Sequence, residues 1–175
     1  MRRVLCGLAA MLFLTGCGTV GHGQLSPSEA ASMVNEIDGL SNAEVVCAET
    51  APRFLDVGGT AYCQLEVTVE DGYQVERAAE FAEFLLEVIW AVETRNKPPK
   101  LTVTLNLPQG TKFDPVEALQ ANGWETIQGK YVGELWGVFA HENGYFTGHT
   151  EATEHFGSWP GKVPKVPRGL LTPLS

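Results

Sequence analysis

Apolar residues recur at helical spacing most strongly over residues 75–95. The apolar face there is so wide that the helix is predicted to be covered on both flanks. Four glutamates form its polar stripe: Glu76, Glu80, Glu83 and Glu87. We interpret this stripe as a solvated helix face, because like charges along an exposed helix are ordinary. A calcium site or a surface for a cationic partner is the alternative.

Two shorter helices are predicted from the residues at their ends. The first begins at Ser26, with Glu29 completing a capping box, and ends near Gly39. The second begins at the N-cap Asp114, and it stops at Asn122-Gly123 because glycine readily takes the left-handed conformation that ends a helix. Both helices are therefore short, and the helix over residues 75–95 is the long one.

Alternation of apolar and polar residues predicts half-buried strands in the rest of the chain. The segments predicted as strands are residues 43–48, 63–70, 101–107, 124–127, 130–141 and 145–151. Turns at Gln128-Gly129 and Asn143-Gly144 would join the last three into an antiparallel meander. Asn-Gly is a strong hairpin signal because both central residues of a type I′ turn need a positive φ.

These elements predict one α+β domain over residues 27–157. Its sheet is expected to be mostly antiparallel, with five to six strands, and to carry one long helix and two short helices. Residues 158–175 contain four prolines and are expected to form an extended tail, since proline cannot donate to a regular hydrogen-bond ladder. A chain of 175 residues with 44% apolar and 19% charged residues suits a single globular domain.

The N-terminus has the pattern of an export signal that ends in a cysteine. Two arginines precede an apolar run over residues 4–14, which is too short to span a bilayer as a permanent helix. The sequence Leu14-Thr15-Gly16-Cys17 resembles the lipobox of bacterial lipoproteins. An ordinary secreted protein with a cysteine at its cleavage site is the alternative.

The lipobox resemblance implies cleavage after Gly16 and lipidation of the Cys17 thiol, usually with acylation of the new amino terminus. Residues 1–16 would then be a lipoprotein signal peptide, and residues 17–26 a flexible tether. The expected location is the bacterial cell membrane, with the protein lipid-anchored on the extracytoplasmic side.

Cys47 and Cys63 remain as an even pair once Cys6 leaves with the signal and Cys17 takes lipid. A disulfide is the expected state of such a pair in an exported domain. Both cysteines belong to the inward-facing sets of their strands, and antiparallel pairing would place them side by side. A redox or metal pair is the alternative, although the spacing resembles neither CxxC nor a zinc pattern.

The charge of the mature chain limits its partners. Removal of residues 1–16 takes away two of the 12 basic residues and none of the 21 acidic ones, leaving a formal net charge of −11. This charge argues against nucleic acid or an anionic membrane surface as the main partner. Membrane contact is therefore expected through the Cys17 lipid, and a cationic protein partner is permitted.

The best-populated cluster of polar residues lies near the C-terminus: His141, Glu142, His149, Glu151, Glu154 and His155. With a two-residue turn at Asn143-Gly144, His149 would lie opposite Val138 on the face that carries Trp136 and Glu151. His141 would lie opposite Phe146 on the other face. No metal site using both histidines is therefore expected, and the spacing matches no HExxH motif.

Aromatic residues also gather in this predicted hairpin: Trp136, Phe139, Tyr145 and Phe146. They could form an exposed binding surface, although a hairpin this aromatic more often packs into the core. The sequence leaves this choice open.

The sequence predicts no catalytic residues, no metal site and no cofactor. It contains no G-x-S-x-G motif and no glycine-rich phosphate loop. We therefore expect an envelope lipoprotein that acts without catalysis, by binding or assembly, with an envelope protein as a possible partner. Two alternatives stay open: a small hydrolase using the His149 and Glu151 region, and an inhibitor or sensor of a basic secreted protein.

Overall fold

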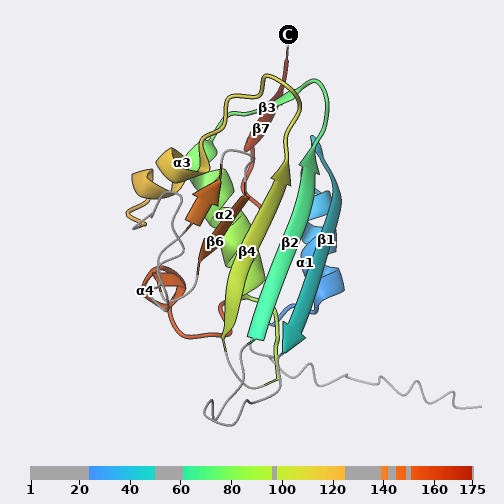
Figure 1. Cartoon of the computed structure of the whole chain (residues 1–175). Coiled ribbons are helices and arrows are strands. Elements are labelled where there is room, and N and C mark those ends of the chain that lie inside the picture. Colours follow the sequence, from blue (N-terminus) through green and yellow to red (C-terminus); the bar gives the residue numbers. More distant parts are fainter. Residues whose placement is uncertain are drawn as a thin grey trace, which may run out of the picture.

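The helix predicted over residues 75–95 lies at the centre of the computed structural model as α2 (Ala78–Trp90) (Figure 1). The structure describes residues 24–49, 61–95, 98–124, 139–141, 145–148 and 151–174. Helix α2 is shorter than predicted at both ends, because the residues beside it make other hydrogen bonds. Strand β3 (Tyr73–Val75) pairs with the tail, and Val92 pairs with Leu25 in an isolated bridge. Among the described residues, the apolar side chains of α2 are nearly all buried.

The remaining elements lie around α2 and confirm the α+β class. The helices are α1 (Pro27–Asn35), α3 (Pro115–Ala121) and α4 (Glu151–Phe156). The strands are β1 (Leu40–Glu49), β2 (Ala61–Val69), β4 (Pro99–Asn106), β5 (Phe139–His141), β6 (Tyr145–Gly148) and β7 (Leu171–Pro173). Helices α1 and α2 lie behind the strands in the view of Figure 1, on one face of the sheet.

The main sheet has the order β1-β2-β4-β6-β5, and β3 and β7 form a separate two-stranded sheet. Strands β1 and β2 are antiparallel, as are β4 and β6 and the β5–β6 pair. Strands β2 and β4 are parallel, which the prediction of a mostly antiparallel sheet did not include. The cause is α2, which carries the chain back to the end of the sheet where β2 began.

Both predicted short helices are present with their predicted N-caps. The Ser26 N–H donates to Oε2 of Glu29 over 2.8 Å, and the Glu29 N–H donates to Oγ of Ser26, which completes the capping box. The Glu117 N–H donates to Oδ1 of Asp114 over 3.2 Å at the start of α3. Helix α1 ends at Asn35 rather than near Gly39, and the Asn35 side chain accepts the Ala43 N–H at the start of the next strand.

The predicted meander differs from the structure near its C-terminal end. Strand β6 ends at Gly148, and Glu151 begins helix α4, so the strand predicted over residues 145–151 is too long. The reason is a change of period, since Ala152 and Phe156 are apolar residues at helical spacing and both contribute to the core. Trp124 belongs to no strand, and residues 125–138 lie outside the described residues.

The proline-rich tail packs along the helical side of the domain. The Trp159 Nε1–H donates to the Val92 carbonyl over 3.2 Å, and the Trp90 Nε1–H donates to the Gly157 carbonyl over 3.3 Å. Farther on, β7 pairs with β3 in antiparallel register. The tail is extended, but the prediction that it forms no regular ladder is wrong for Leu171–Pro173. Leu170 and Leu171 are buried, and this burial stabilises the pairing.

Gly39 should be the glycine most sensitive to substitution. Its φ of +88° disfavours any side chain, and an added Cβ would lie closer than 3.0 Å to three ring atoms of Tyr73. We expect Gly39→Ala to lower the free energy of unfolding by about 3 kcal/mol, combining backbone strain with overpacking. Gly72→Ala is the matched control, because Gly72 has a φ of +86° and no atom within 4 Å of the added carbon.

The Gly72→Ala variant should therefore cost only about 1 kcal/mol, the backbone contribution alone. Urea denaturation of both variants, followed by tryptophan fluorescence, measures the two costs. Equal losses for the two alanine variants would contradict the role given to the Tyr73 ring.

Candidate functional site

The predicted disulfide is present between the two antiparallel strands that the pattern identified. Cys47 and Cys63 are direct partners in the β1–β2 register, with Cα atoms 4.1 Å apart and their sulfurs bonded. Cys63 is 1% exposed and belongs to the core, whereas Cys47 is only partly buried. The disulfide therefore joins an edge strand of the sheet to the strand beside it.

A groove of about 430 Å³, the disulfide groove, lies next to this disulfide, between the segment of residues 47–49 and the segment of residues 93–95. The Arg95 N–H donates to Oε1 of Glu49 over 2.7 Å and holds the two segments together. The N-terminal end of the described chain is fixed at the same place, since the Leu25 N–H donates to the Ala91 carbonyl over 2.8 Å. The chain thus enters the domain beside the disulfide.

The histidine and carboxylate cluster is only partly described. Glu142 and His149 lie outside the described residues, and His141 and Glu151 are described by their backbone alone, at the end of β5 and the start of α4. His155 and Glu154 are both in α4. The alternative of a small hydrolase using the His149 and Glu151 region therefore stays a prediction.

The register of the hairpin differs from the predicted one by one residue. His141 pairs with Tyr145, and Ala140 pairs with Phe146, so the prediction that His141 lies opposite Phe146 is wrong. The pairing with β4 aligns Phe146 with the buried Val103, and the hairpin register places Ala140 rather than His141 beside that pair. A one-residue shift exchanges the faces of a strand, so the argument that placed His141 and His149 on opposite faces no longer holds.

The aromatic residues of the hairpin are not described at the level of side chains. Trp136 lies outside the described residues, and Phe139, Tyr145 and Phe146 are placed by their backbone only. Whether they form a binding surface or part of the core therefore stays open.

A polar cluster that the sequence did not predict lies where α2, α3 and α4 meet. The Asn122 Nδ2–H₂ group donates to Oε2 of Glu83 over 2.7 Å and to the Ala79 carbonyl over 2.9 Å. The ring of His155 stacks on that of Trp124, with centroids 4.1 Å apart and an interplanar angle of 5°. Asn122 carried only a helix-stop signal in the sequence, so its contact with α2 could not be foreseen.

The glutamates of the predicted solvated stripe are not equally exposed. Glu80 is exposed and forms an ion pair with Arg77, whereas Glu83 and Glu87 are half-buried. Burial raises the pKa of Glu83, and the charge of His155 opposes that rise. Burial also raises the pKa of Glu87, and the negative charge of Glu83 raises it further. The stripe is therefore solvated in part only.

These groups hold neighbouring chain segments together. Within residues 24–49, 61–95, 98–124 and the later described segments, no group of three His, Cys, Asp or Glu residues could bind a metal ion. Trp124 is 2% exposed, and its Nε1–H has no hydrogen-bond acceptor among the described residues. Asn122 joins α2 to the chain just after α3, and the Trp124–His155 stack joins that same segment to α4.

Removal of the disulfide should destabilise the domain. The two cysteines close a loop with a sequence separation of 16, for which chain-entropy reasoning gives about 3 kcal/mol. We expect the double variant Cys47→Ala/Cys63→Ala to have a free energy of unfolding lower by that amount, as measured by urea denaturation. Its stability should also no longer depend on reductant. A wild-type protein whose melting temperature is unchanged by reductant would contradict a structural role for the bond.

Glu87→Gln should stabilise the protein at neutral pH. Because the folded pKa is raised, the folded state binds more protons than the unfolded state between the ordinary glutamate pKa, about 4.3, and the raised value. Stability is therefore lost as pH rises through this window, and the neutral glutamine removes that loss. We expect a melting temperature a few degrees higher at pH 7 and little change at pH 4.

Glu70→Gln is the charge-matched control for Glu87→Gln, because Glu70 is exposed beside the turn before β3. Thermal unfolding by circular dichroism at the two pH values measures the effect. The assignment fails if Glu70→Gln stabilises the protein as much as Glu87→Gln does.

Comparison with known proteins gives no relative from which a function could be transferred. No protein-family model, curated protein or solved structure matches this chain. Within the described ranges, no helix is long and apolar enough to cross a membrane. Function is therefore inferred below from the residues and their geometry.

Proposed function

We propose that the protein is an envelope lipoprotein, held on the extracytoplasmic side of a bacterial membrane by lipid on Cys17, and that it acts by binding another protein. The observation that carries this proposal is the Cys47–Cys63 disulfide. Disulfides persist in oxidising, exported compartments and are rare in the cytosol. The disulfide and the lipobox-like sequence therefore support the same location from independent parts of the chain.

The place where the chain enters the domain is consistent with a membrane tether. The backbone of Leu25 is hydrogen-bonded to Ala91 and Glu93, just beyond the C-terminal end of α2. Six residues lie between Cys17 and Gln24, and this segment can span at most about 25 Å even when fully extended. A lipid on Cys17 would therefore keep the disulfide groove near the membrane and direct the opposite end of the domain away from it.

We favour binding over hydrolysis because the sequence contains no catalytic motif. His155 stacks on Trp124 and lies near Phe156. The acidic excess of the mature chain favours a cationic partner, which agrees with the inhibitor or sensor alternative. We therefore propose a partner protein of basic character.

Cys17→Ser should release the protein from the membrane. A lipidated cysteine carries two or more acyl chains, and each buried CH₂ contributes about 0.8 kcal/mol to membrane binding. We expect the variant to leave the membrane and detergent phases and to lack the mass of the lipid. Cell fractionation, detergent-phase partitioning and intact-mass spectrometry measure these changes.

Cys6→Ser is the matched control for Cys17→Ser. It removes a thiol from the predicted signal peptide and should leave both partitioning and mature mass unchanged. A Cys17→Ser protein that still enters the detergent phase after cleavage of its signal would overturn the lipid anchor.

A further inference from the structure

A second groove lies at the other end of the domain from the disulfide. This distal groove has a volume of about 450 Å³ and lies between residues 36–38, which follow α1, and residues 166–171 of the tail. Its volume falls within the range of sites that hold ligands or partner side chains. The groove is thus large enough to accept several side chains.

The floor of the distal groove is apolar. Ile37, Leu170 and Leu171 line it and are 7%, 1% and 7% exposed. Val166 lines the same groove and is 38% exposed, so part of its side chain faces solvent. An incoming apolar side chain would bury mainly the exposed part of Val166, because the other three residues are already covered, and burial of apolar area favours binding.

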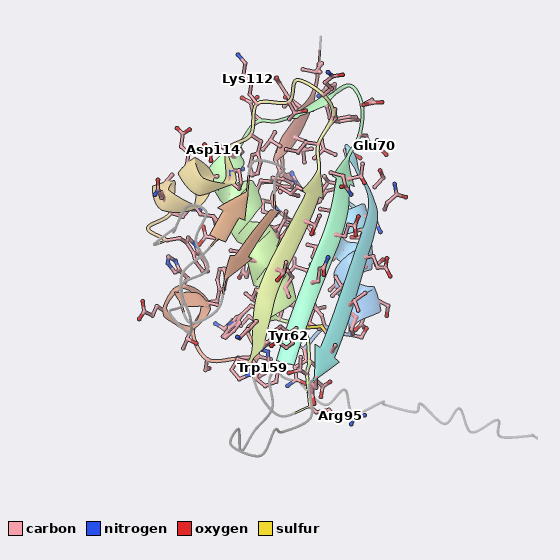
Figure 2. All side chains as sticks on the ribbon, in the orientation of Figure 1. Tyr62, Glu70, Arg95, Lys112, Asp114 and Trp159 are labelled. Carbon is pink, nitrogen blue, oxygen red and sulfur yellow. A yellow bond between two sulfur atoms is a disulfide. The ribbon has the colours of Figure 1, made fainter. Side chains whose placement is uncertain are left out.

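Among the described residues, the rim of the distal groove carries two acidic residues and one basic residue, and the Arg77 side chain donates to the carbonyl of that basic residue, Arg168. Glu36 and Asp38 are exposed beside the floor, and Arg168 is the one basic residue among the groove's lining residues in the described chain. The Glu70 N–H donates to the Gly39 carbonyl over 2.8 Å, which brings the turn that carries Glu70 and Asp71 to the same end of the domain. Figure 2 shows Glu70 at the end opposite Arg95.

The C-terminal end of α1 adds a partial negative charge at the groove, and the N-terminal end of α2, beside Leu170, adds a partial positive one. The C-terminal end of a helix carries a partial negative charge, and lysine or arginine usually stands there. The last turn of α1 contains no basic residue, and acidic Glu36 and Asp38 follow it. This arrangement is unfavourable for the isolated helix, and a cation at the groove would relieve it.

The distal groove would also be accessible in an anchored protein. Residues 76–77 at the N-terminal side of α2 donate to the Leu170 carbonyl, whereas Leu25 is held at the other end of that helix. Helix α2 has 13 residues and is therefore about 20 Å long. The groove is separated by that length from the place where the chain enters the domain.

We propose that the distal groove binds a basic segment of an exported partner protein. An apolar side chain of the partner occupies the floor beside Val166, and flanking lysines or arginines contact Glu36 and Asp38. This proposal rests on the proposed function, which places the groove outside the cytoplasm and directs it away from the membrane. Charge complementarity at such a rim raises the association rate and selects basic partners.

The test measures binding of a fluorescein-labelled peptide in which Lys-Leu-Lys triplets are separated by Gly-Ser. The lipidated protein is placed in neutral phosphatidylcholine nanodiscs, and empty nanodiscs serve as the blank. We expect anisotropy to increase with protein concentration and the dissociation constant to increase with salt. The same peptide with Glu in place of Lys should not bind.

The variants separate the rim from the floor. Glu36→Gln/Asp38→Asn should weaken binding about tenfold at low salt, as expected for two exposed charge pairs. Val166→Ser should weaken it about threefold through lost apolar contact. Glu44→Gln/Glu66→Gln removes the same charge from exposed positions of β1 and β2 and should leave binding unchanged.

Several results would overturn the distal groove as a docking site. One is binding by the Glu36→Gln/Asp38→Asn variant that is as tight as binding by the wild-type protein, and another is equal binding of the Lys and Glu peptides. A third is a dimer that dissociates on Val166→Ser, because a second copy of the protein would then be the occupant. The soluble Cys17→Ser protein is tested in parallel. Binding by this protein but not in nanodiscs also overturns the site, because the groove then faces the membrane. If the protein in nanodiscs and the Cys17→Ser protein both bind the peptide, but the Cys17→Ser protein stays on membranes in cells, only the lipid anchor is overturned.

Discussion

Burial of α2 is the constraint on which the rest of the fold depends. Its apolar residues face in every direction except along the line of Glu80, Glu83 and Glu87, so one sheet cannot cover them. The main sheet covers one side, and α1, α3, α4 and the tail cover the others. The parallel β2–β4 pair follows from the same constraint, because the chain passes along α2 between those strands. The half-buried carboxylates are the cost of covering the helix so completely.

The sequence predicted those features that depend on neighbouring residues. The capping box at Ser26, the N-cap at Asp114 and the alternation in β1 and β2 are local, and each is present in the structure. The disulfide could be predicted because the two strands place their cysteines on inward-facing positions of one antiparallel pair. The expected exported location, the even number of remaining cysteines and the antiparallel strand pairing all point to a bond between the same two residues.

Features that depend on distant contacts could not be predicted. The hairpin register was misplaced by one residue, because the turn sequence alone does not determine which residues of β5 and β6 pair. The distal groove is formed by residues 36–38 and residues 166–171, and neither segment has a binding motif of its own. Likewise, Asn122 ended a helix in the sequence but also binds Glu83 on another helix. Local pattern carries no information about such tertiary contacts.

The tail has a consequence for the order in which this domain can form. Trp159 and Leu170 cover a helix that lies in the middle of the chain, and they come from its last residues. A polypeptide that emerges N-terminus first, from a ribosome or a translocation channel, leaves that flank of α2 open until these residues follow. Contacts so distant in sequence also form slowly, since the intervening chain must be ordered first. If the chain passes through a channel, late covering of α2 would leave it incompletely folded during that passage. Loss of the C-terminal residues would leave this flank of α2 permanently uncovered.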